Sequence, residues 1–157
     1  GLEREGTIVA GVIYNPANEE LFVAERGKGA FLNDQRIRVA ARKRLADAVI
    51  ACGLPHIGRG NIALGQRETA TVQEKVAGLR RFGAAALDLA WVAASRLDAY
   101  WERDLKSWDM AAGILMVREA GGYVSDCDGA DDRSAKCHSG AGNETMQKEL
   151  LRVLKDA

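Results

Sequence analysis

The fold is decided by residues 108–122, WDMAAGILMVREAGG, which predict a helix followed by a sharp stop. Three apolar side chains in this stretch recur at the i, i+4 and i+7 spacing of one buried helix face: Met110, Ile114 and Val117. Gly121 supplies the stop, because glycine adopts left-handed backbone without strain. Residues 123–125, Tyr-Val-Ser, are predicted as a strand that leaves the helix. This pair of elements indicates an α/β arrangement.

An aspartate stands at the start of this helix. Ser107 is expected as the N-cap, which places Asp109 in the first turn, where the helix dipole stabilises an anion. Such an acid is often only a stabiliser of its own helix, and that explanation stays open. However, residues 98–102 are predicted as a strand ending in Glu102, and residues 103–106 as the loop into the helix. Since ligands collect at the carboxyl edge of α/β sheets, we expect Glu102 and Asp109 to converge there.

A third element is expected at the same edge. Strands and helices alternate from residue 79 onward, which predicts βαβ crossovers and a mostly parallel sheet. Gly83, Ala84 and Ala85 open a helix after a strand, and their free N–H groups suit oxygen ligands. Considered alone, each residue has a simpler interpretation: Gly83 as a turn residue and Glu102 as a surface acid. Together with Asp109 they predict a polar pocket of N–H donors and two carboxylates, a set of oxygen ligands that suits Mg²⁺.

The first part of the chain has a different pattern. Residues 2–6 resemble a hairpin turn with no strand before it, and the sequence begins with Gly1, so it looks like a fragment. Turn signals then separate four predicted strands, of which the first is apolar on both faces and therefore central: 7–14, 21–24, 30–32 and 36–39. The predicted fold class is α/β (an α+β layered sandwich), with an antiparallel meander in residues 1–42 and a helix-flanked sheet in residues 43–157.

Composition narrows the possible partners. The 157 residues carry 22 Lys and Arg against 22 Asp and Glu, so no global field favours nucleic acid or a membrane surface. The basic run at residues 36–44 is interpreted as a solvated edge, and direct nucleic-acid binding is not expected. No apolar run approaches 18 residues, and no signal peptide is visible. His56 and His138 are expected on the surface.

An odd number of cysteines without a CxxC pair is typical of reduced thiols in a cytoplasmic protein: Cys52, Cys127 and Cys137. A Cys127–Cys137 bond is the less favoured alternative.

Several segments, in order, resemble the inositol monophosphatase family. They are WDMAAG (108–113) with EAGG (119–122), GVIYNP (11–16), AERGKGAFLN (24–33) and GAAALD (83–88). The resemblance covers essentially the whole chain, but only the C-terminal part of a family member. It implies a partial inositol-monophosphatase-like fold and a magnesium-dependent, lithium-sensitive phosphomonoesterase.

The resemblance also implies roles for individual residues. Asp109 matches a magnesium ligand that also contacts a substrate hydroxyl, and Glu102 matches an acid that hydrogen-bonds another ring hydroxyl. Gly83, Ala84 and Ala85 match the segment that holds the sugar-alcohol hydroxyls, although some relatives carry a hydroxyl residue at position 84. In the family, a metal-activated water attacks the phosphorus.

Two family motifs are absent from residues 1–157: the Asp-Pro-x-Asp-Gly-Thr segment and the upstream Glu-Glu pair. We therefore assign no secure catalytic residue here and expect residues 1–157 alone to be inactive and poorly soluble. The expected partners are a small phosphorylated polyol and a second copy in a homodimer. The alternatives are a fructose-bisphosphatase, a nucleotide 3′-phosphatase, or a bacterial relative that acts in transcription antitermination through protein contacts.

Overall fold

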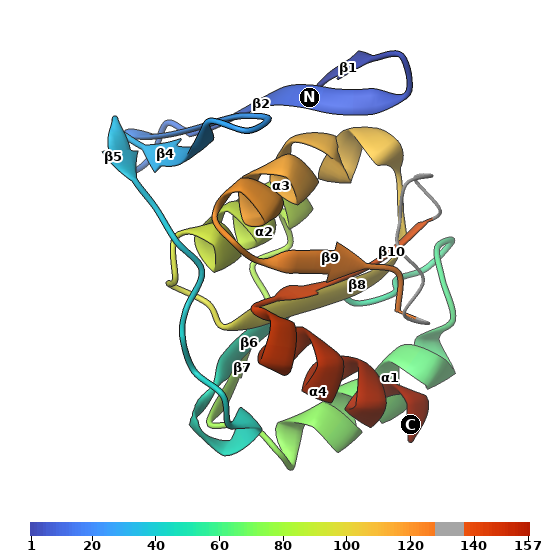
Figure 1. The fold of residues 1–157 in the computed structure, drawn as a ribbon. Coiled ribbons are helices and arrows are strands. Elements are labelled where there is room, and N and C mark those ends of the chain that lie inside the picture. The colour runs from blue at the N-terminus through green and yellow to red at the C-terminus, as the bar shows by residue number, and fades with distance from the viewer. Residues whose placement is uncertain (128–136) are drawn as a thin grey trace.

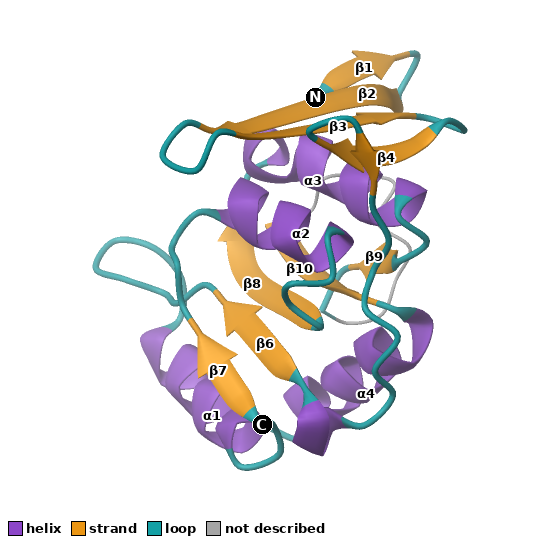
Figure 2. Cartoon of the chain, turned by 90° about the vertical axis from the view of Figure 1, so that its left-hand side faces the viewer, coloured by secondary structure: helices purple, strands orange, loops and turns teal. Residues whose placement is uncertain are grey.

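The computed structural model describes residues 1–127 and 137–157, which form two sheets and two pairs of helices stacked in layers (Figure 1). The antiparallel sheet lies outermost and covers α2 (Ala85–Ala93) and α3 (Ser107–Glu119). Below them lies the second sheet, whose other face carries α1 (Ile62–Gln73) and α4 (Glu144–Lys155) (Figure 2). The layered α/β prediction is confirmed.

The first sheet is a meander whose five strands pair in chain order: β1 (Leu2–Arg4), β2 (Thr7–Asn15), β3 (Glu20–Glu25), β4 (Gly29–Leu32) and β5 (Gln35–Arg36). The expectation of a turn at residues 2–6 with no preceding strand was wrong, because Leu2–Arg4 is itself the strand and pairs with β2. Glu5 and Gly6 alone make the turn, with φ of 51° and 72°, as a tight two-residue hairpin requires. β2 is therefore central, as predicted.

The last strand of the meander is shorter than predicted. β5 ends at Arg36, whereas residues 36–39 were expected to pair. The N–H of Val39 instead donates to the carbonyl of Ala120, at 3.1 Å. The chain thus leaves the sheet early and attaches to the end of α3.

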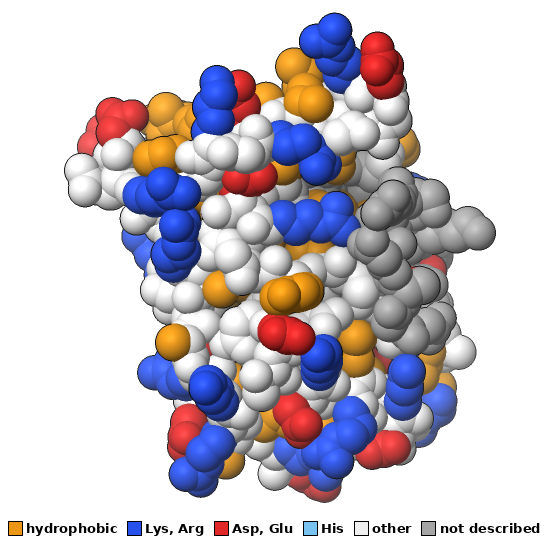
Figure 3. Space-filling view, viewed as in Figure 1, with side chains coloured by type: hydrophobic (Ala, Val, Ile, Leu, Met, Phe, Trp, Pro, Cys, Tyr) orange, Lys and Arg blue, Asp and Glu red, His pale blue; other side chains and the backbone are white. Residues whose placement is uncertain are grey.

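Only one face of the meander is buried within the described part of the chain. Side chains such as Phe22 and Ala24 point inward to the helices and are almost fully buried. Their strand neighbours point outward and are between 38% and 59% exposed: Val12, Tyr14, Leu21 and Val23. Hydrophobic side chains accordingly show along the upper side of the molecule, over this sheet (Figure 3). The apolar side chains on one face of β2 are therefore buried against the helices, and those on the other face form part of an exposed row.

The second sheet is mixed, in the order β7-β6-β8-β10-β9. Its strands are β6 (Val49–Cys52), β7 (Gly78–Arg80), β8 (Ala99–Leu105), β9 (Tyr123–Ser125) and β10 (Cys137–Gly142). β6 is parallel to both β7 and β8, whereas β10 runs antiparallel to β8 and β9. The mostly parallel sheet is confirmed, with one reversed strand between β8 and β9.

β8 contributes to two hydrophobic cores. Tyr100 packs in the core between the sheet and α2 and α3, while Trp101 packs in the core on the side of α1 and α4. Both rings are almost fully buried, since successive strand residues face opposite sides of the sheet. The same alternation points Glu102 to the side of Tyr100, toward α2.

The two helices above this sheet begin side by side. Both follow strands of the parallel set, so they run in the same direction. They meet where Gly113 of α3 faces Leu89 of α2, and a Cβ added at Gly113 would lie 2.6 Å from the Leu89 Cβ. The absence of that carbon lets the helices approach closely, which fixes the relative position of their first turns.

Candidate functional site

The start of α3 differs from the prediction in its cap. The N-cap is Lys106, and Ser107 is the first helical residue. The cause lies in β8, which runs to Leu105 and leaves a single residue between strand and helix. The Asp109 carboxylate performs the capping instead, since its Oδ2 accepts the Lys106 N–H at 3.0 Å. Gly121 ends the turn after the helix with φ of 85°, as expected.

The predicted groups at the helix starts come together. Ala85 and Asp109 each lie four residues, about one turn, before the Leu89–Gly113 contact. The structure therefore places the first turns of α2 and α3 next to each other. Asp109 is half-buried there, and within the described residues its Oδ1 accepts no hydrogen bond. Oδ1 is thus available to a ligand.

The start of α2 is open to solvent and has no capping side chain. Gly83 is exposed, has φ of 81°, and has no atom within 4 Å of the place of a Cβ. Ala84 is the N-cap and makes no side-chain cap hydrogen bond. No side-chain cap therefore competes for the N–H groups of the first turn, and their binding of an oxygen ligand stays a prediction.

Glu102 lies inside β8 rather than at its end. The predicted loop at residues 103–106 was wrong, because pairing with β10 extends β8 to Leu105. The Glu102 side chain is only 14% exposed. The Tyr100 hydroxyl donates a hydrogen bond to Oε2, and the Arg59 guanidinium lies 3.6 Å from Oε1. The carboxylate is therefore held at both oxygens while part of it still reaches solvent.

Asp88 is a buried acid of this site that the sequence reasoning missed. It lies in α2, its side chain is fully buried, and neither oxygen has a hydrogen-bond partner within the described part of the chain. Burial is the main cause that raises the pKa of Asp88 to about 7; the Ala84 backbone acts against this rise, and the charge of Glu102 adds to it. The available signal was a lone acid inside the apolar helix AALDLAWVA. At neutral pH Asp88 is thus poised between its charged and neutral forms.

The thiols near the site are buried. Burial, with the neighbouring charges of Asp88 and Glu102, raises the pKa of Cys52 to about 12, so this thiol stays protonated and unreactive. Cys127 is buried as well. The alternative Cys127–Cys137 bond depends on the side chain of Cys137, which lies outside the described residues.

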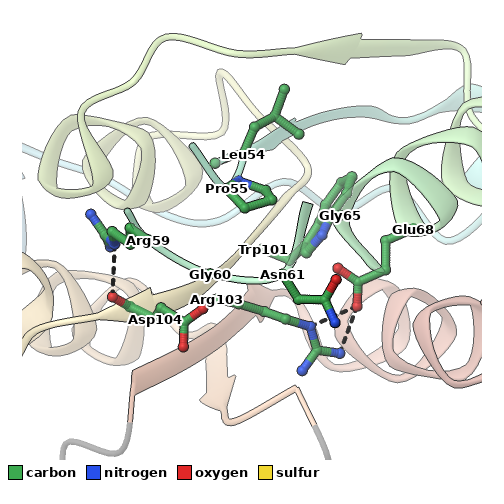
Figure 4. A pocket seen from close by; sticks show the side chains of 11 residues that line it. Leu54, Pro55, Arg59, Gly60, Asn61, Gly65, Glu68, Trp101, Arg103 and Asp104 are labelled. Carbon is green, nitrogen blue, oxygen red and sulfur yellow. Dashed lines mark hydrogen bonds and ion pairs between the residues drawn. The ribbon is translucent and has the colours of Figure 1, made fainter. Parts of the chain in front are cut away.

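A small pocket lies on the other side of β8, between α1 and the loop of residues 53–61 (Figure 4). An ion pair between Glu68 and Arg103, with a shortest distance of 2.6 Å, fills part of it. Arg59 spans its rim and donates from Nε to the Asp104 carbonyl at 3.0 Å. None of the predicted site residues lines this pocket. Its loop, however, supplies the arginine that reaches Glu102.

The residues that the structure describes hold no group of three or more His, Cys, Asp and Glu side chains that could bind a metal ion. Asp109 is thus a single carboxylate at the start of a helix, and its role as a metal ligand stays a prediction. Mg²⁺ commonly takes only one or two protein carboxylates and completes its shell with water and phosphate oxygens, so Asp109 fits one position of such a shell. No helix in residues 1–127 and 137–157 is long and apolar enough to cross a bilayer.

Comparison with known proteins identifies one family over the whole chain. The model of the inositol monophosphatase family matches residues 1–157. An inositol-1-monophosphatase of Mesorhizobium japonicum is 56% identical over 154 residues, which cover 98% of this chain and 58% of the relative. The Nus factor SuhB of Pseudomonas aeruginosa is 43% identical over 153 residues, covering 96% of this chain and 56% of that protein.

A solved structure shows the same fold. The crystal structure of the extragenic suppressor protein suhB from Bartonella henselae superposes with a TM-score of 0.95 at 57% identity, over 99% of this chain and 59% of that one. The chain thus spans somewhat less than three fifths of the length of these relatives.

Proposed function

The chain belongs to the inositol monophosphatase family, and from this premise we propose that it forms part of a magnesium-dependent phosphatase for inositol monophosphate or a similar small polyol phosphate. The observation that carries the proposal is the meeting of the α2 and α3 first turns through the Leu89–Gly113 contact. This contact supports a site in which the N–H donors of the first turn of α2 lie beside the Asp109 carboxylate. The relatives named inositol-1-monophosphatase support the choice of substrate class.

In this proposal each residue has a separate task. Asp109 would hold Mg²⁺ through Oδ1, because Oδ2 already accepts the Lys106 N–H. Glu102 accepts a hydrogen bond from a substrate hydroxyl, and the N–H groups at residues 83–85 bind the remaining alcohol oxygens. When bound, Mg²⁺ would neutralise charge on the phosphate and activate a water molecule. Further ligands belong to the part of the relatives that this chain does not match, so residues 1–157 alone should release no phosphate.

Asp109→Asn in the full-length protein tests the metal role. Loss of an outer-shell partner of a metal ligand alone costs 10–100-fold, so loss of the ligand itself should lower magnesium-dependent phosphate release from inositol 1-phosphate by at least about 100-fold. The matched control is Glu144→Gln, which alters the first-turn acid of α4 on the far side of the second sheet. If both variants keep near-normal turnover, Asp109 only stabilises its helix and the assignment is wrong.

Glu102→Gln tests the substrate role. The variant should change the preference among sugar phosphates, because the amide presents an N–H in place of one acceptor oxygen. The Mg²⁺ concentration that gives half-maximal activity should stay the same. Weaker Mg²⁺ activation with an unchanged preference would instead place Glu102 at the metal.

A second function is favoured by the 43% identity to a Nus factor. In that case the protein acts in a transcription antitermination complex through protein contacts, with or without phosphatase activity. A pull-down with purified RNA polymerase and antitermination factors, run beside the phosphatase assay, separates the two. A third alternative keeps the phosphatase activity but changes the substrate to fructose bisphosphate or a nucleotide 3′-phosphate. Assays with a panel of these substrates test it. Lithium inhibition, a homodimer and a cytoplasmic location stay predictions.

A further inference from the structure

A glycine makes the room that the Glu102 side chain occupies. Gly53 follows β6 directly, and a methyl group added to it would overlap the carboxyl carbon and Oε2 of Glu102. The backbone itself does not require glycine here, because Gly53 is outside the left-handed region. Its N–H donates to the Trp101 carbonyl at 3.0 Å, so it cannot shift without losing a bond to β8. Space for Glu102 is therefore the structural reason for glycine at this position.

Other groups hold Glu102 against this backbone. Tyr100 lies two residues earlier on the same face of β8 and donates its hydroxyl to Oε2. The Tyr100 pKa is raised far above its usual value, mainly by burial and then by the Glu102 charge, so the hydroxyl remains a donor. Arg59 approaches Oε1 to 3.6 Å from the loop that begins at Gly53. Each oxygen of the carboxylate thus has its own protein partner, Tyr100 for Oε2 and Arg59 for Oε1.

A second buried acid lies on the side of α2. Asp88 has no hydrogen-bond partner in the described residues, and the Glu102 charge is one of the causes that raise its pKa. A Glu102 carboxylate turned toward Asp88 would lose the bond from Tyr100 and would approach an acid that is partly charged at neutral pH. Tyr100 and Arg59, with the space at Gly53, therefore favour the observed arrangement of Glu102.

We propose that Gly53 is a specificity-determining position, because its missing side chain allows Tyr100 and Arg59 to fix the Glu102 carboxylate where it can receive a polyol hydroxyl. This inference rests on the proposed role of Glu102 as a contact to the substrate alcohol. Gly53 and Tyr100 are positioning residues that act through Glu102. They should matter for phosphate esters of hydroxyl-rich rings and not for esters without such hydroxyls.

The test uses Gly53→Ala in the full-length protein, with inositol 1-phosphate and 4-nitrophenyl phosphate as substrates. Loss of a hydrogen bond to a charged group corresponds to roughly a 10-fold change in affinity, so KM for inositol 1-phosphate should rise by about that factor. Turnover of 4-nitrophenyl phosphate and the Mg²⁺ requirement should change less than about 2-fold. The control is Gly78→Ala, where the added methyl meets only the flexible Arg80 side chain at 3.1 Å.

A second variant separates positioning from general damage. Glu102→Ala removes the three Glu102 atoms that a Cβ at position 53 would meet, which are Cγ, Cδ and Oε2. In a double-mutant cycle, Gly53→Ala should therefore raise KM much less in the Glu102→Ala background than in the wild type. If Gly53→Ala does not fold, as circular dichroism would show, Tyr100→Phe takes its place, since it removes only the hydroxyl at Oε2.

Three outcomes would overturn the inference, and only one of them would also overturn the proposed function. If Glu102→Gln shifts the substrate preference but Gly53→Ala and Tyr100→Phe leave it unchanged, Gly53 has no positioning role and the proposed function survives. If Glu102→Gln itself leaves the preference unchanged, the substrate contact and this inference both fail. Additive effects in the double-mutant cycle would also count against Gly53.

Discussion

Glu119 joins the end of α3 to the meander, and its replacement gives a direct measure of that connection. Oε1 accepts the Gly27 N–H at 2.8 Å, and Oε2 accepts the Gly29 N–H at 2.9 Å. Both glycines shape the turn between β3 and β4, with φ of 78° and 100°. One carboxylate therefore satisfies two backbone donors of a turn about 90 residues away.

In Glu119→Gln one oxygen becomes an NH₂ group, which faces an N–H donor and cannot accept its bond. Hydrogen bonds to charged groups contribute about 1.5–3 kcal/mol, and the lower end applies because the site is only half-buried. Proteins of about 150–250 residues change their Tm by about 2–4 °C per kcal/mol, so a decrease of roughly 3–6 °C is expected in the full-length protein.

Differential scanning calorimetry measures this shift, with Glu25→Gln as the control on the same hairpin. Among the described residues the Glu25 carboxylate pairs with Lys28, and both side chains are more than half exposed, so loss of the pair should cost under about 0.5 kcal/mol. Equal Tm values for Glu119→Gln and wild type would show that the lost bond contributes nothing, and the assigned role of Glu119 would be wrong.

Three further predictions concern buried contacts and the exposed sheet. The Asp88 pKa rises from 3.8 to about 7 on folding, so the folded state holds the proton more tightly and the free energy of unfolding should fall as pH rises between those values. Asp88→Asn should remove most of this slope, and parallel slopes in urea titrations of both proteins from pH 4 to 8 would refute it. Gly113→Ala should destabilise by about 1–3 kcal/mol through overpacking against Leu89, despite better helix propensity; a raised Tm would contradict this. Residues 1–157 produced alone should aggregate through the exposed row of the meander, and Val12→Thr with Leu21→Thr should raise the soluble fraction in a sedimentation assay.

Local patterns in the sequence were sufficient for most elements. The helix predicted within residues 108–122 is observed as Ser107–Glu119, and Gly121 ends it in the left-handed conformation as predicted. The errors occur where a distant strand decides the outcome. Leu2–Arg4 is too short to be recognised without its partner β2, and β8 continues past Glu102 because β10 pairs with it.

The parts of the site that could not be predicted depend on contacts between residues far apart in the sequence. Nothing near Gly53 indicates that Glu102, on another strand, fills the space of its missing side chain. Asp88 stood in a recognised segment, but its burial without a partner depends on how α2 packs on the sheet. Glu119 likewise stood in a family motif whose physical use, the turn at residues 27–29, is visible only in three dimensions.

The sharing of β8 between two cores has a consequence for cooperativity. Tyr100 belongs to one core and its neighbour Trp101 to the other, so neither core can loosen without disturbing the strand that supports the other. Glu102 is the next residue and lies on the same rigid backbone. Local opening of either helical layer would therefore reach the proposed substrate contact, and the site should keep its geometry only while the two cores remain folded together.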